Sequence, residues 1–134
     1  MATPVLLKAL LVWLAILVLA IVNGGMRERA LNPIMGPVGG LVTSGAILSL
    51  CIFLVAFFSA GWLGAAEAPE FWLIGLLWLA LTIVFEFGFG RLVQRRTWAE
   101  LLQAYAFRGG NLWPVVLVVT LVSPWVAARL RGLV

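Results

Sequence analysis

Long apolar runs separated by short polar links are the main feature of this sequence. A helix needs about 20 mostly apolar residues to cross the hydrocarbon core of a bilayer. The runs therefore predict an all-α integral membrane bundle of four transmembrane helices, with residues 1–134 forming a single transmembrane domain. The predicted spans are residues 5–22, 38–63, 71–87 and 112–128.

Turn-forming residues mark the limits of these runs. Asn23-Gly24-Gly25 follows the first run, and glycine takes the left-handed conformation of a helix C-cap at little cost. Pro37 and Pro114 stand at the starts of the second and fourth runs, where a helix tolerates proline. Lys8 followed by the apolar residues 9–22 resembles the charged and apolar regions of a signal peptide, but no clear small-x-small cleavage motif follows, so we expect an uncleaved first span.

Composition supports a lipid environment. The chain is 64% hydrophobic and 10% charged, with a mean hydropathy of +1.15, which leaves too little charged surface for a water-soluble domain. The net charge is +4, but the basic residues lie in the short links between apolar runs. Cations in such positions meet lipid headgroups, so we expect the lipid bilayer as a partner and no nucleic acid.

The basic residues also predict an orientation. The first and third links carry more of them than the opposite side, which has Lys8, Arg129 and Arg131. Short links rich in arginine and lysine prefer the cytoplasm, so both termini should lie on the non-cytoplasmic side of a multi-pass protein. The arginines of the two links are Arg27, Arg29, Arg91, Arg95, Arg96 and Arg108.

The third link contains a predicted amphipathic helix at residues 98–107. Thr97 and Glu100 form a T-x-x-E capping box at its start. Spacing of i, i+3, i+4 and i+7 puts one apolar face on the helix. This face fits the membrane surface and the end of the bundle equally well. Its residues are Trp98, Leu101, Leu102 and Tyr105.

The second run is rich in small residues spaced four apart. Such spacing lets helices approach closely in lipid, either inside the bundle, which we favour, or at a contact with a second chain. Cys51 lies in the same run, where a single thiol acts as a small hydrophobe and forms no internal disulfide. The small-residue pairs are Gly40 and Ser44, Gly45 and Ser49, and Ala56 and Ala60.

A candidate polar cluster should lie at the cytoplasmic boundary of the bundle. Charges at membrane depth are costly and normally pair or serve a function. We predict that Glu86 is ionised and bonded to Arg27, to Arg91 or to the amide of Asn23, which would hold the first link against the third span. The alternative is a headgroup, proton or ion site. The cluster comprises Asn23, Arg27, Glu28, Glu86 and Arg91.

The missing residue types bear on function. The chain has no histidine and no aspartate, which removes the common nucleophile triads and the usual zinc and haem sites. We therefore expect no cofactor and no metal, and nothing favours an enzyme. The leading hypothesis is a non-enzymatic structural or accessory membrane protein, acting as an oligomer or as a small subunit of a larger membrane complex. The alternative is a small homo-oligomeric transporter or channel with a polar site near Glu86.

Several short motifs carry a resemblance over most of the chain. They are Asn23-Gly24 with Arg27-Glu28, Pro33 and Gly36, Phe85-Glu86-Phe87 with Phe89-Gly90, and Trp113-Pro114 with Pro124. In these the chain resembles a group of small uncharacterised bacterial four-helix inner-membrane proteins. The resemblance implies the cell inner membrane and draws attention to Arg27, Glu28 and Glu86. It implies no substrate.

Overall fold

Helices form every regular element in the part of the chain that the structure describes. This structure is a computed structural model, and it describes residues 3–93, 95–103 and 112–134. The prediction of an all-helical fold is confirmed for these residues. The elements are α1 (Thr3–Met26), the π-helical turn η1 (Arg27–Leu31), α2 (Asn32–Ser59), α3 (Ala68–Leu92), α4 (Trp98–Gln103) and α5 (Trp113–Leu130).

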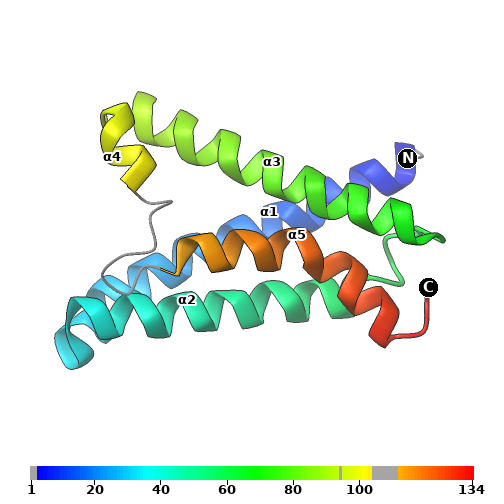
Figure 1. Cartoon of the computed structure of the whole chain (residues 1–134), viewed down its shortest axis with the longest axis horizontal. Helices are drawn as coiled ribbons and strands as arrows, with labels where there is room; N and C mark the ends of the chain where they lie inside the picture. The colour runs from blue at the N-terminus through cyan, green and yellow to red at the C-terminus, as the bar shows by residue number, and fades with distance from the viewer. Residues whose placement is uncertain (1–2, 94, 104–111) are drawn as a thin grey trace.

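The first link is helical rather than irregular. The helical stretch Thr3–Ser59 comprises 57 residues and would measure about 85 Å if it were straight. The chain instead reverses direction between α1 and α2 (Figure 1). Gly36 interrupts the helix with φ 79° and ψ 169°, a conformation that side chains disfavour. Pro33 lies in the first turn of α2, so α2 begins before residue 38, where the second span was predicted to start.

The long helices pack in a ring. α1 contacts α2 and α3, and α5 contacts the same two helices from the opposite side. Both chain termini and link 60–67 lie at one end, which we call the terminal end (Figure 1). η1, α4 and the α3–α4 link lie at the other end, which we call the arginine end (Figure 1). α1 therefore runs antiparallel to α2 and parallel to α3.

Apolar side chains fill the interior, and two tryptophans join α1 to α3. Trp78 is fully buried, and its indole N–H donates to the carbonyl of Ala9 at 2.9 Å. The indole of Trp13 donates to the Thr82 hydroxyl at 3.1 Å. The other core side chains include Val12, Ile16, Leu48, Ile52, Phe71, Ile74 and Val116.

Small residues bring the helices together inside the chain. A Cβ on Gly75 of α3 would lie 1.9 Å from the carbonyl oxygen of Leu121 in α5. A Cβ on Gly45 would lie 2.6 Å from the Cβ of Leu112. The small residues Gly40, Ser44, Ala56 and Ala60 of the second run are also buried. This spacing therefore serves internal packing, as we favoured.

The outer surface is strongly apolar. Large side chains point outward along α1, α2 and α3, including Leu11, Phe58 and Leu76, and Phe58 is 74% exposed. Water-soluble proteins rarely expose continuous apolar surface of this kind. Three helical stretches are long and apolar enough to cross a membrane, namely Thr3–Ser59, Ala68–Leu92 and Trp113–Leu130. These features are those of a membrane protein.

Candidate polar site at the arginine end

Asn23 and Ser44 join α1 to α2 close to the chain reversal. The Asn23 side-chain amide donates to the carbonyl of Ser44 at 3.1 Å, and the Ser44 hydroxyl donates back to Asn23 Oδ1. Both residues are buried, with 8% and 1% of their surfaces exposed. Each polar group thereby replaces the hydrogen bonds that it loses with water. Asn23 therefore links α1 to α2 through two hydrogen bonds.

The predicted bond between Glu86 and Asn23, Arg27 or Arg91 is wrong. The structure has no such hydrogen bond or ion pair among the described residues. The Asn23 amide is already bonded to Ser44. Arg27 lies on η1, which packs against α1 and α2 and makes no contact with α3 within the described ranges. The prediction assumed that groups at one depth would meet, but depth alone does not determine which side of a helix ring a residue occupies.

Arg91 is held by the α3–α4 link rather than by Glu86. Its Nη1 donates to the carbonyl of Arg96 at 3.0 Å. Its guanidinium also lies over the Trp98 ring, 4.9 Å from the ring centroid. Since Arg91 is five residues beyond Glu86, the two side chains leave α3 in different directions.

Glu86 faces α5 instead of the first link. Its carboxyl interacts with the indole of Trp113 at the start of α5, and the charge of Arg96 acts on it. Its Oε2 atom is buried and has no hydrogen-bond partner of normal geometry among the described residues. Sequence reasoning missed Trp113 and Arg96 as neighbours of Glu86, because Trp113 is brought there by the antiparallel packing of α3 and α5, and Arg96 by the chain folding back after α3.

The capping box of the third link is confirmed. The Thr97 hydroxyl accepts from the Glu100 backbone N–H at 3.2 Å, and Glu100 Oε1 accepts from the Thr97 backbone N–H at 3.3 Å. Trp98 and Leu102 are 57% and 59% exposed, so the bundle does not cover them. Tyr105, the end of the predicted helix 98–107 and the side chain of Leu101 lie outside the described residues.

Glu28 projects from η1 into an exposed position. It shares η1 with Arg27 and Arg29, and no ion pair joins Glu28 to either arginine in the described structure. The candidate cluster is therefore divided: Arg27 and Glu28 lie beside α1 and α2, whereas Glu86 and Arg91 belong to α3. The cluster remains a prediction as a functional site.

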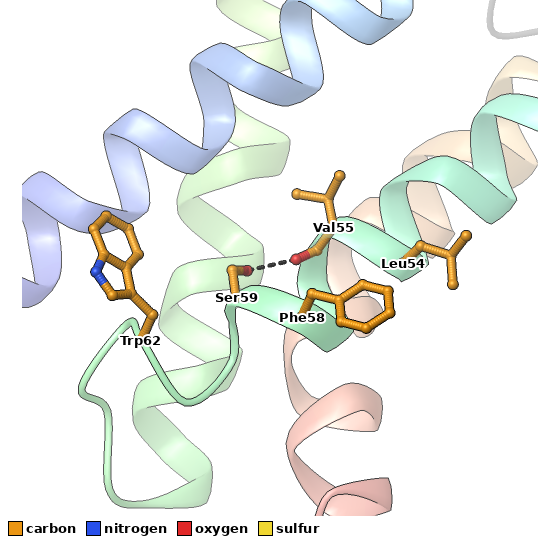
Figure 2. A pocket seen from close by; sticks show the side chains of 5 residues that line it. All are labelled: Leu54, Val55, Phe58, Ser59 and Trp62. Atoms are coloured by element: carbon orange, nitrogen blue, oxygen red, sulfur yellow. Dashed lines mark hydrogen bonds between the residues drawn. The ribbon is translucent and has the colours of Figure 1, made fainter.

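An open apolar groove lies at the opposite end of α2. It has a volume of about 430 Å³ and is lined by Leu54, Val55, Phe58, Ser59 and Trp62 (Figure 2). The Ser59 hydroxyl donates to the Val55 carbonyl of its own helix at 2.6 Å (Figure 2). The Ser59 hydroxyl is therefore not free to orient a small-molecule ligand in this mostly apolar groove.

Comparison with known proteins adds no family. The described residues contain no group of three potential metal ligands. Their fold and polar contacts define a class, namely helical proteins with helices apolar enough to enter a membrane. Neither a family model, nor a curated protein, nor a solved structure matches the chain.

Proposed function

We propose that this chain is a multi-pass protein of a bacterial inner membrane that crosses the bilayer four times. The chain reversal between α1 and α2 supports four crossings, because a straight helix of residues 3–59 would be far longer than a bilayer is thick. The distance along the helix between polar or aromatic residues near its two ends also supports four crossings. The helical rise from Lys8 to Arg27, and from Trp72 to Arg91, is about 28 Å in each case, close to the thickness of the hydrocarbon core.

Within this arrangement the two termini lie on the non-cytoplasmic side. The arginine end carries Arg27, Arg29, Arg91, Arg95 and Arg96, and positively charged short links stay in the cytoplasm. Link 60–67 carries one charge, from Glu67, and it is acidic. The placement in an inner membrane rests on the resemblance described above.

We propose that the protein is a non-enzymatic structural or accessory component, acting as an oligomer or as a small subunit of a larger membrane complex. The observation that carries this proposal is the apolar interior. Trp78 fills the space between helices at zero exposure, with Ile52, Phe71, Ile74 and other apolar residues around it. A conduit for ions or polar substrates needs polar groups near the bilayer middle, and the described core of one copy is closed by packed side chains.

The oligomeric state tests this proposal directly. The full chain is extracted in a mild detergent, purified and analysed by size-exclusion chromatography with light scattering, and co-purifying proteins are identified by mass spectrometry. We expect either a defined oligomer or a partner of constant stoichiometry. A monomer without a stoichiometric partner, in the mildest detergent that keeps the protein folded, would contradict the proposal.

Transport through an assembly of copies is the second candidate. It is favoured by buried oxygens that have no hydrogen-bond partner among the described residues, in Ser49, Glu86 and Ser123. Buried polar atoms normally find protein or water partners. Solute flux into proteoliposomes tests this candidate. Loss of flux in Glu86→Gln, with flux retained in the exposed control Glu67→Gln, would raise transport above the structural role.

A further inference from the structure

The chain folds back on itself where α3 meets α4. The Arg96 backbone N–H donates to the carbonyl of Gly90 at 2.8 Å, and the Arg91 side chain holds the Arg96 carbonyl at 3.0 Å. Arg95, between them, has a φ of 54°, in the left-handed region that turns a chain sharply. These contacts bring three arginines together at one sharp bend of the backbone, which we call the α3–α4 corner (Arg91, Arg95 and Arg96).

No ion pair neutralises this corner in the described chain, although the charge of Arg96 also acts on the Glu86 carboxyl. Arg95 and Arg96 are exposed, and no ion pair to either is present among the described residues. The nearest carboxylate in sequence, that of Glu100, accepts both Thr97 donors in the capping box. Glu86 is turned toward Trp113 inside the bundle. The guanidinium groups of Arg95 and Arg96 are therefore available to an anion from outside the chain.

Apolar side chains stand beside these cations. Leu92 is 82% exposed, and Val93, Trp98 and Leu102 are exposed as well. Trp98 packs against Phe87 with a centroid distance of 5.8 Å, which fixes α4 to the end of α3. This combination of a tryptophan, exposed aliphatic side chains and arginines is typical of protein surfaces at the boundary between acyl chains and headgroups.

We propose that the α3–α4 corner binds the phosphodiester headgroup of an anionic phospholipid. The planar guanidinium donates paired N–H groups that suit phosphate oxygens. Arg95 and Arg96 supply these donors, and Trp98 and Leu102 lie against the upper part of the acyl chains. Arg91 positions the corner through its bond to the Arg96 carbonyl. The inference rests on the membrane insertion proposed above and adds a ligand to it.

Lipid selectivity in vesicles tests the proposal. The full chain is reconstituted in phosphatidylcholine vesicles, and the association of spin-labelled phosphatidylglycerol is measured relative to spin-labelled phosphatidylcholine. The test variant is the double change Arg95→Gln and Arg96→Gln. The matched control is Lys8→Gln with Arg129→Gln, which removes the same charge from the terminal end. Circular dichroism checks that each variant keeps its helix content.

We expect the wild type to prefer phosphatidylglycerol and the test variant to lose about tenfold in relative association, since each basic residue near an anionic surface contributes several-fold. The control should keep the preference. Equal loss in both variants, or no preference in the wild type, would overturn the proposal. It would also fail if inorganic phosphate removed the preference while sodium chloride of equal ionic strength did not, because the corner would then bind free phosphate.

The same vesicles separate this inference from the proposed insertion. Alkaline carbonate strips proteins that are only attached to the surface. Protein that resists carbonate and shows no lipid preference overturns the headgroup site alone. Protein that carbonate releases overturns both the insertion and the site.

Discussion

The basic side chains at the two ends of the bundle differ in the contacts that they make. At the terminal end, Arg131 donates to the carbonyl of Phe57 at 2.9 Å, and the Lys8 ammonium lies 5.2 Å from the centre of the Trp62 ring. At the arginine end, Arg95 and Arg96 are exposed and have no ion-pair partner in the described chain. Lys8 and Arg131 thus make contacts within the terminal end, and so does Arg91 at the arginine end, whereas Arg95 and Arg96 have no such contact in the described chain.

Packing along α3 and α5 follows the same division. Toward the terminal end, Gly75 allows α3 to touch the backbone of α5, and Trp72 stacks on Trp125 at 5.4 Å. Toward the arginine end, a Cβ on Gly88 would meet nothing within 4 Å, and Glu86 keeps a buried oxygen without a partner among the described residues. The comparison indicates that α3 and α5 pack more closely toward the terminal end than toward the arginine end.

The largest effect is expected from Gly75→Ala. The added Cβ would clash with the Leu121 carbonyl oxygen, so α3 and α5 would have to separate, at a cost of about 3 kcal/mol in the free energy of unfolding. Gly88→Ala is the matched control and should be neutral or stabilising by up to about 1 kcal/mol. Chemical unfolding in detergent measures both. Equal destabilisation by the two changes would break the comparison between the ends of α3.

A smaller effect is expected at the Asn23–Ser44 pair. Ser44→Ala should cost about 1–2 kcal/mol, because it leaves the buried Asn23 amide oxygen without its donor. Asn23→Ala should add less than its separate cost in the double variant. Ser59→Ala, which removes a hydroxyl bonded only to its own helix, should be neutral. Full additivity of the first two changes would show that the pair is not coupled.

Arg131→Gln tests the charge contacts of the terminal end. The loss of its bond to the Phe57 carbonyl should lower stability by about 1 kcal/mol. Arg129→Gln, two positions earlier and exposed, should change stability by less than about 0.5 kcal/mol. Thermal unfolding in detergent compares the two variants. A larger loss from Arg129→Gln would contradict the assignment of Arg131 as the residue that secures the end of α2.

Glu86→Gln should have the smallest effect. Because Glu86 has no ion pair with Arg27 or Arg91 in this structure, the change should lower stability by no more than about 0.5 kcal/mol. Its effect should add fully to that of Arg27→Gln. A decrease of about 3 kcal/mol in the free energy of unfolding is typical when one partner of a buried ion pair is removed. Such a decrease would contradict this expectation and support the predicted pairing of Glu86.

Sequence patterns predicted the local features of this fold well. Apolar run length identified the long helices, and the T-x-x-E motif identified the start of α4, because both signals depend on neighbours within a few residues. Proline and glycine were ambiguous in the first link. Asn32-Pro33 begins α2, since proline is accepted in a first helical turn as readily as in a loop.

The polar contacts could not be predicted in the same way. The partner of Asn23 is Ser44, across an antiparallel pair of helices, and Glu86 faces Trp113 across another. Such contacts depend on the rotation of each helix about its axis. In apolar helices that are hydrophobic all round, no amphipathic stripe records that rotation. The spacing of small residues was the one signal present, and it did mark Gly40 and Ser44 as interior.

The sidedness of links 27–31 and 60–67 tests the four-crossing account most directly. Cys51, the single cysteine, is replaced by Ala, and one new cysteine is placed at Glu28 or at Glu67, followed by labelling of sealed, right-side-out bacterial membranes with an impermeant maleimide. The account predicts that the cysteine at Glu67 is labelled in sealed membranes and that the cysteine at Glu28 is labelled only after lysis. Labelling of both positions from the same side would contradict it, because α2 would then not cross the membrane.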